Sequence, residues 1–273
     1  MLMKLMRIAV AALTVITVAV FAAVFFTEKV TDDKTIPVIN MDDGVLEVKA
    51  GSGEKELLAG VTAYDEKDGD ITDRVLVESI GKFSEIGYCK VTYAVSDKDN
   101  HVVTAKRQIH YTNYTPPRFT MSRPLVFSVY KELNVVGIVG AKDCLDGDIS
   151  SNVIIYSPDY EAAREGSFTL HANVMNSKGD RAEIDLPMLV EKLPKDAPQI
   201  ILSDYLIYIK KGKNPDWKSY IDDMTDANGL EAQLEINIET DFKSGTAGMY
   251  NIDYYGTDVN GFTGHTRLIA VVE

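Results

Sequence analysis

The feature of this sequence that most constrains its fold is a pattern that recurs three times. Each occurrence opens at a proline, and the opening prolines Pro37, Pro117 and Pro198 lie 80 and 81 residues apart. Repetition at a fixed period is typical of a structural unit that is used several times along a chain. The 273 residues are therefore expected to form several similar domains after a short N-terminal region.

Two further landmarks recur inside each unit. The first is an acidic stretch at 65–72, which aligns without a gap with 143–150 and is mostly lost at 225–230. The second begins 18 or 19 residues after the glycine of that stretch and ends in a polar turn. A polar turn with Asn or Gly before another apolar run indicates a β-hairpin.

The segments before these turns alternate between apolar and mostly polar residues. The apolar positions are Cys89, Val91 and Tyr93 in the first unit, Phe168, Leu170 and Ala172 in the second, and Tyr250, Ile252 and Tyr254 in the third. A period of two is typical of a strand with one face in a core. We therefore predict an all-β protein with three tandem β-sandwich domains at 36–114, 115–193 and 194–273.

A 19-residue stretch without charge, 8–26, precedes these units. As a helix it would be roughly 28 Å long, which matches the hydrocarbon core of a bilayer. Lys4 and Arg7 precede it, so we expect a cytoplasmic tail at 1–7, a transmembrane helix at 8–26 and a linker at 27–35, with the domains outside. The alternative is a cleaved signal peptide, whose apolar core is usually shorter.

Charge and composition limit the classes of function. The formal net charge is −13, which argues against binding to nucleic acid. Cys89 and Cys144 fall in different units, so no disulfide can form within a unit, and Cys89 is expected to be a small buried side chain. The four histidines recur at no shared landmark, and no hydrolase or phosphate-binding motif is present. We expect no enzymatic activity and no cofactor other than calcium.

The repeats resemble bacterial immunoglobulin-like (Ig-like) domains of surface proteins, of the type catalogued as a domain of unknown function (DUF5011). The resemblance rests on 61–72 and 87–100, which carry the pattern Val-x-Ala-x-Asp-x-x-Asp-Gly-Asp-Ile-Thr followed by Gly-x-x-x-Val-x-Tyr-x-Val-x-Asp. The second unit departs from it at Asn176, and the third has lost most of the acidic stretch. The resemblance implies three Ig-like sandwiches on a bacterial cell surface and brings no catalytic residues.

The acidic stretch is a candidate metal site. Its first-unit carboxylates could supply oxygen ligands to calcium; they are Asp65, Asp68, Asp70, Asp97 and Asp99. The spacing is not that of an EF-hand loop. The alternative is that these side chains accept hydrogen bonds from backbone amides and fix a turn, with Gly69 and Gly147 at positive φ.

An aromatic cluster in the third unit is a candidate binding surface. It contains Tyr205, Tyr208, Trp217 and Tyr220, and such side chains either stack on a ligand or pack in a core. We expect a membrane-anchored protein of the cell envelope that binds a partner protein or a cell-envelope polysaccharide through this unit. The alternative is a structural spacer or scaffold without a ligand, in which these aromatic rings would be buried.

Overall fold

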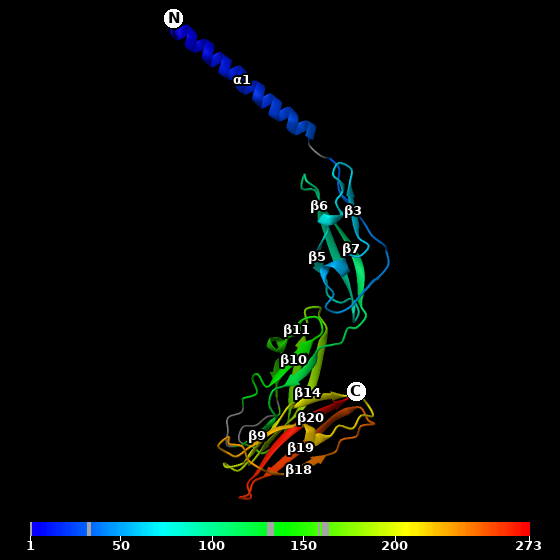
Figure 1. Cartoon of the computed structure of the whole chain (residues 1–273), viewed down its shortest axis with the longest axis vertical. Helices are drawn as coiled ribbons and strands as arrows, with labels where there is room; N and C mark the ends of the chain where they lie inside the picture. Colours follow the sequence, from blue (N-terminus) through cyan, green and yellow to red (C-terminus); the bar gives the residue numbers. More distant parts are fainter. Residues whose placement is uncertain (1, 32–33, 130–133, 158, 160–163) are drawn as a thin grey trace. The chain divides into compact units, whose positions relative to one another are not determined.

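The computed structural model describes residues 2–31, 34–129, 134–157, 159 and 164–273. The chain divides into two compact units (Figure 1). Unit 1 comprises Met1–Val48, Ser52–Gly81 and Tyr88–Tyr111. Unit 2 comprises Lys49–Gly51, Lys82–Gly87 and Thr112–Glu273.

Unit 1 begins with helix α1, which runs from Leu2 to Thr31. Among the described residues, it is the one helix long and apolar enough to cross a membrane, over Ala9–Phe26 with a mean hydropathy of 2.6. A signal sequence near the N-terminus would have the same properties. The helix extends beyond the predicted 8–26 on both sides, because the flanking residues include Leu, Met, Lys and Glu and no Gly or Pro.

The rest of unit 1 is the first sandwich, formed by β1 to β7. Its elements are β1 (Val38–Asn40), β2 (Leu46–Val48), α2 (Glu54–Leu57), β3 (Thr62–Asp65), β4 (Gly69–Asp70), η1 (Thr72–Arg74), β5 (Leu76–Ile80), β6 (Tyr88–Ser96) and β7 (Val102–Tyr111). Within the described residues they form one sheet of order β1-β3-β4 and a second of order β2-β7-β6-β5.

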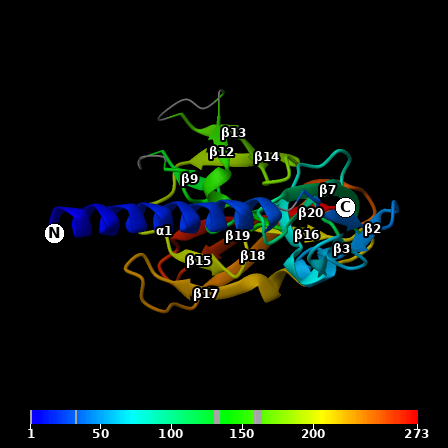
Figure 2. The same cartoon turned by 90° about the horizontal axis from the view of Figure 1, so that it is seen from above.

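Unit 2 contains two further pairs of sheets in its described residues. The second sandwich has β8 (Arg118–Met121), β9 (Val126–Ser128), β10 (Val139–Asp143), β11 (Gly147–Asp148), η2 (Ser150–Asn152), β12 (Ile154–Tyr156), β13 (Gly166–Met175) and β14 (Arg181–Glu191). The third has β15 (Gln199–Leu202), β16 (Leu206–Ile209), η3 (Trp217–Tyr220), β17 (Ile221–Thr225), β18 (Glu235–Thr240), β19 (Gly248–Thr257) and β20 (Thr263–Val272). Figure 2 shows these two sets of strands from a second direction.

The same pairing recurs in each sandwich. A long antiparallel hairpin forms the middle of the larger sheet: β6–β7, β13–β14 and β19–β20. A short strand then runs parallel to the last strand of that hairpin, as in the β2–β7 pair, and β9–β14 and β16–β20 repeat it. This pairing ties the start of each sandwich to its end.

The predicted strand pattern is confirmed. All nine alternating apolar positions named from the sequence are buried in the cores, including Cys89, which is fully covered. The hairpins turn at the predicted polar segments, and Gly69 and Gly147 have φ values of 77° and 72°. The chain is an all-β protein after α1. The division into three domains at 36, 115 and 194 stays a prediction, because the second and third sandwiches share one compact unit.

Candidate functional site

The acidic stretch of the first sandwich forms a hydrogen-bonded turn. Asp65 ends β3, and its Oδ1 accepts the backbone N–H groups of Lys67 and Asp68, both at 2.9 Å. A carboxylate that accepts from residues two and three positions later fixes the turn without help from a metal. The turn then places Gly69 at positive φ and leads into β4.

The other carboxylates of this region are also bound by protein groups. Asp68 accepts the backbone N–H of Lys98 at 2.8 Å and pairs with Arg74 at 3.2 Å. Burial raises the pKa of Asp68, but the hydrogen bonds and charge of Lys98 outweigh it, so the pKa lies below its ordinary value. Asp68 thereby joins the acidic turn to the β6–β7 turn.

The remaining three carboxylates serve separate local contacts. Asp70 accepts the N–H of Thr72 at 3.0 Å at the start of η1. Asp97 accepts the N–H of His101 at 2.8 Å and pairs with the imidazole Nδ1 of His101 at 2.7 Å. Asp99 pairs with Lys67 at 2.7 Å.

These contacts give the predicted calcium ligands a different role. Within the described residues, no group of three or more His, Cys, Asp or Glu side chains is placed to hold a metal ion. Each of these five carboxylates instead has its own local partner, a turn amide or a basic side chain; they are Asp65, Asp68, Asp70, Asp97 and Asp99. The arrangement matches the turn-fixing alternative, and the calcium prediction finds no ligand set here.

The second sandwich repeats the turn with one change of side chain. Asp143 Oδ1 accepts the N–H groups of Leu145 and Asp146 at 2.8 and 3.0 Å. Asp146 accepts the N–H of Ser177 at 2.6 Å, as Asp68 does from Lys98. The residue at the place of Asp97 is Asn176, and its Nδ2 donates to Asp143 Oδ2 at 3.1 Å.

The predicted aromatic surface does not form one exposed platform. Tyr205 is buried, and its hydroxyl accepts the N–H of Leu202 at 3.2 Å. Tyr208 contacts the second sandwich, where its hydroxyl accepts the N–H of Phe119 at 3.2 Å and the Arg118 guanidinium lies 4.8 Å from its ring centre. Tyr205 therefore belongs to the core, which contradicts its prediction as a surface residue, and Tyr208 is half-buried against the second sandwich.

Trp217 and Tyr220 lie on η3 and are half-buried against the core of unit 2. The Trp217 ring packs edge-on against Phe242 at 4.8 Å, and its carbonyl accepts the Tyr254 hydroxyl at 2.9 Å. Both rings therefore pack against the core and remain partly exposed. The aromatic residues of the third sandwich stabilise its packing, which the sequence had offered as the alternative to binding.

A partly buried polar cluster joins the second and third sandwiches. His265 of β20 lies between Glu191 of β14, 2.6 Å from Nδ1, and Asp253 of β19, 2.9 Å from Nε2. Arg267 also pairs with Asp253 at 2.6 Å. An imidazole with a carboxylate at each nitrogen donates twice and is positively charged. Burial lowers the pKa of His265, but the hydrogen bonds to Asp253 and Glu191 outweigh it and the pKa is raised.

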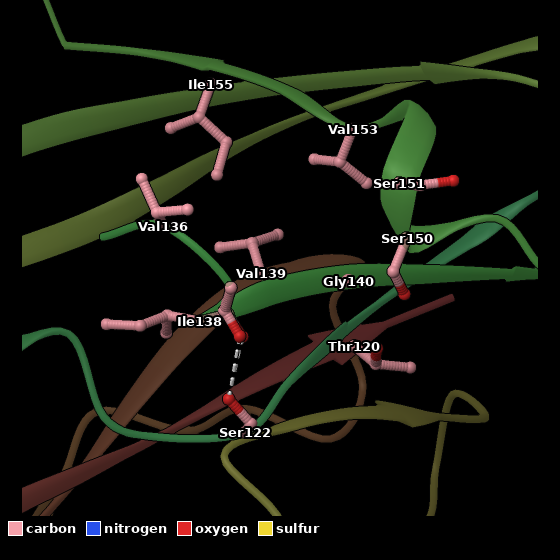
Figure 3. A pocket seen from close by; sticks show the side chains of 11 residues that line it. Thr120, Ser122, Val136, Ile138, Val139, Gly140, Ser150, Ser151, Val153 and Ile155 are labelled. Atoms are coloured by element: carbon pink, nitrogen blue, oxygen red, sulfur yellow. Dashed lines mark hydrogen bonds between the residues drawn. The ribbon is translucent and has the colours of Figure 1, made fainter. Parts of the chain in front are cut away.

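A hollow opens on the second sandwich and has a volume of about 630 Å³. Figure 3 shows aliphatic side chains toward β12 and hydroxyl groups toward β8 and η2. Its lining residues, none of them charged, are Thr120, Ser122, Val136, Gly137, Ile138, Val139, Gly140, Ser150, Ser151, Val153 and Ile155. We call this hollow the β8–β12 groove. An uncharged groove on a chain of net charge −13 fits a neutral ligand.

The floor of the β8–β12 groove depends on Gly140 of β10. A Cβ atom at this position would lie 2.5 Å from Ser150 Oγ and 2.9 Å from Thr120 Oγ1. Ser150 Oγ is held in place because it accepts the N–H of Ala141 at 3.1 Å. Sequence reasoning missed the groove, and the one signal for it was a glycine where the first sandwich has Thr62.

Comparisons with known proteins agree with this fold. Residues 44–110 match the family described as "Bacterial surface protein, Ig-like domain", a range that includes β2 to β7. The match confirms the Ig-like resemblance for the first sandwich and fits an extracellular recognition or adhesion role. A search of the curated proteins finds no match.

Solved structures with similarity to this chain include a cadherin and a multidomain clostridial protein. Drosophila N-cadherin EC1-3 is 14% identical over 89% of this chain and 90% of its own, with a TM-score of 0.32. The M60 catalytic domain with the CBM51-1 and CBM51-2 domains of Clostridium perfringens ZmpB is 14% identical over 88% of this chain, with a TM-score of 0.23. This chain spans 31% of that ZmpB chain. At these TM-scores neither likeness bears on function.

Proposed function

We propose that this chain is a membrane-anchored, extracytoplasmic recognition protein that binds a partner protein or polysaccharide of the cell envelope. The observation that carries the proposal is the β8–β12 groove, which offers both aliphatic and hydroxyl contacts without charge. This assigns binding to the second sandwich. The third sandwich, which the sequence favoured, uses its aromatic rings for packing.

The exposed apolar surface at the rim of the groove favours a ligand with apolar contacts. Val136 lines the groove and is 85% exposed. When a ligand covers an exposed aliphatic side chain beside a concave surface, the free energy of the complex is lowered because apolar surface leaves water. Thr120 and Ser122 provide hydroxyl groups on the opposite side, as a glycan or a peptide backbone requires.

The groove has a matched pair of test variants. Val136→Asp places a charge at its rim, and Val259→Asp places the same charge on the β19–β20 turn of the third sandwich, where Val259 is 94% exposed. Full-length protein, crosslinked on intact cells of a deletion strain, is expected to form a specific product. That product should be lost with Val136→Asp and kept with Val259→Asp. Equal products from both variants would contradict binding at the groove.

Anchoring by α1 is the second part of the proposal. The apolar length of Ala9–Phe26 supports it, and the basic residues before it favour a cytoplasmic N-terminus. Intact protein in the membrane fraction after alkaline carbonate washing, with the original N-terminus by mass spectrometry, would support an anchor. A mature N-terminus within or after α1 would instead show a cleaved signal peptide.

A spacer or scaffold without its own ligand is the second candidate, and the partly buried Glu191–His265–Asp253 cluster favours it. This cluster and a shared hydrophobic core hold the second and third sandwiches in one unit, as a stiff spacer requires. A crosslinking profile with membrane-embedded neighbours alone, unchanged by Val136→Asp, would favour the spacer. Both candidates are proposed to lack enzymatic activity, since the sequence has no recognisable catalytic motif.

A further inference from the structure

Two neighbouring loops of the third sandwich carry five exposed lysines. The first loop follows β16 and includes η3, at 210–220, and the second joins β18 to β19, at 241–247. The Gly212 N–H donates to the Ser244 carbonyl at 2.7 Å, and the rings of Trp217 and Phe242 are 4.8 Å apart, so the two loops lie side by side. We call their exposed lysines the lysine patch; they are Lys210, Lys211, Lys213, Lys218 and Lys243.

The protein does not neutralise the charge of the lysine patch. Against its five lysines the two loops contain two acidic residues, Asp216 and Asp241, which leaves a net charge of +3. Asp216 Oδ1 accepts the N–H of Lys218 at 3.1 Å at the start of η3. Within the described residues, the ion pairs of the third sandwich involve other cations, which are Arg118, His265 and Arg267. The five ammonium groups are therefore available to a ligand.

This concentration of lysines belongs to the third sandwich alone. The corresponding loops of the first sandwich, 49–61 and 81–87, contain three basic and three acidic residues. Those of the second sandwich, 129–138 and 157–165, contain two basic and four acidic residues. The rest of 194–273 has two basic residues and eleven acidic ones. The lysines are therefore not a requirement of the fold that the three sandwiches share.

We propose that the lysine patch binds a linear polymer of the cell envelope that bears phosphate groups along its length. A Lys ammonium group is a compact point charge that suits phosphate, whereas planar carboxylates favour the fork of an Arg guanidinium, and the patch contains no Arg. Because the lysines are spread over two loops, successive phosphates of one polymer can contact several of them. This site shares no residue with the β8–β12 groove.

The surroundings of the lysine patch favour such a polymer over other anionic surfaces. Charges more than about 8 Å away are largely screened at physiological salt, so the net charge of −13 does not prevent local binding. A lipid surface fits less well, because the exposed large apolar side chains in the described residues of this sandwich lie outside the two loops, at Leu230, Val259 and Phe262. A nucleic acid also fits less well, since the η3 rings pack against the core and form no platform for bases.

Isothermal titration calorimetry of the full chain in phosphatidylcholine nanodiscs tests the proposal, with long-chain inorganic polyphosphate as the probe. Wild type should bind it, and a rise in salt from about 50 to 200 mM should weaken binding about a hundredfold, because five contacts release counterions. The triple variant Lys210→Gln, Lys211→Gln, Lys213→Gln should bind about tenfold more weakly, with a smaller salt dependence. Trp217, the single tryptophan, lies between Lys213 and Lys218, so its emission should change on binding.

A second triple variant is the matched control. Lys55→Gln, Lys90→Gln and Lys106→Gln remove the same charge from exposed positions of the first sandwich and should leave polyphosphate binding unchanged. Val136→Asp should also leave it unchanged, which separates this site from the β8–β12 groove. An equal loss in both triple variants, or a loss in Val136→Asp, would overturn the assignment to the lysine patch, as would a wild type that does not bind. Melting temperatures confirm that each variant is folded.

Three other probes test the chemistry of the ligand. Polygalacturonate carries carboxylates on a similar linear polymer and should bind more weakly than polyphosphate; equal binding would overturn the preference for phosphate. Single-stranded DNA that binds more tightly than polyphosphate would assign the patch to nucleic acid instead. A change in Trp217 emission on transfer of wild type to phosphatidylglycerol nanodiscs, absent from the Lys210, Lys211 and Lys213 triple variant, would assign it to a lipid surface.

Discussion

The first and second sandwiches build the same turn from different side chains. The difference shows which hydrogen bonds the turn requires and which side-chain atoms can change their partner. In both, one carboxylate oxygen accepts two turn amides, and the β6–β7 and β13–β14 turns close on Asp97 and Asn176. The other polar atom of each of these side chains has a different environment in the two sandwiches. In the first sandwich Asp97 Oδ2 pairs with His101 Nδ1, and in the second sandwich Asn176 Nδ2 donates to Asp143 Oδ2.

The third sandwich extends this comparison. Asp258 closes the β19–β20 turn by accepting the N–H of Phe262 at 2.9 Å, as Asp97 and Asn176 do in their turns. The position of Asp65 is occupied by buried Thr225, and Asp226 accepts the N–H of Leu230 at 3.0 Å. The hairpin turn thus keeps its acceptor in every sandwich, whereas the acidic stretch is mostly replaced in the third.

Removing the carboxylate that accepts both turn amides of the second sandwich should have the largest effect on the free energy of unfolding. Asp143→Ala deprives two amides of their acceptor and leaves Asn176 Nδ2 without its carboxylate, so we expect a loss of about 3 kcal/mol. Urea unfolding followed by the fluorescence of Trp217, the single tryptophan, measures it. The control Asp148→Ala removes one exposed contact to Ser150 and should cost about 1 kcal/mol.

This measurement also tests whether the second and third sandwiches unfold together. Trp217 lies in the third sandwich, whereas Asp143 lies in the second. Because they share one hydrophobic core, the Trp217 transition should move with Asp143→Ala. A Trp217 transition that stays in place while circular dichroism reports a destabilised fraction would show that the sandwiches unfold separately.

The Glu191–His265–Asp253 cluster between the second and third sandwiches should lose about 2–3 kcal/mol with His265→Gln, because the change leaves the half-buried Glu191 without a cationic partner. The pKa of His265 is raised, so its contribution is complete below about pH 6.5 and disappears as the pH rises through the folded pKa. Wild-type stability should therefore decline in that range, and the variant should not. His171→Gln, at the exposed Asp185 pair of the second sandwich, should change little; an equal loss there would exclude a special role for this cluster.

Gly140→Ala should cost about 1–2 kcal/mol, since the added methyl group would overlap Ser150 Oγ and Thr120 Oγ1. The first sandwich carries Thr62 at the same place, so Thr62→Ala is the control and should have almost no effect. Thermal unfolding by circular dichroism compares the two variants. Equal effects would show that the β8–β12 groove places no special demand on its floor.

Calcium should have the smallest effect. Each of the five acidic residues in the first sandwich accepts a hydrogen bond from a turn amide or pairs with a basic side chain, and no three of them come together among the described residues, so millimolar calcium should leave the melting temperature unchanged. A chelator should be equally without effect. A rise in melting temperature that Asp65→Asn removes would restore the calcium prediction.

The sequence by itself determined the strands, the hairpins and the apolar N-terminal helix. These depend on local properties: alternation along Val91 and Tyr93 sets which face is buried, and Gly69 and Gly147 set the turns. Such signals are read within a few residues, and a repeat presents them several times.

The tertiary structure alone decided which side chains meet. Tyr208 and His265 connect the third sandwich to the second because they contact residues of β8 and β14, which lie far from them in the sequence. The β8–β12 groove arises between separate strands. The lack of a partner for Asp65 Oδ2, where the corresponding Asp143 oxygen accepts from Asn176, also follows only from the three-dimensional structure. Contacts between residues far apart in sequence depend on how the sheets pack, which no local pattern encodes.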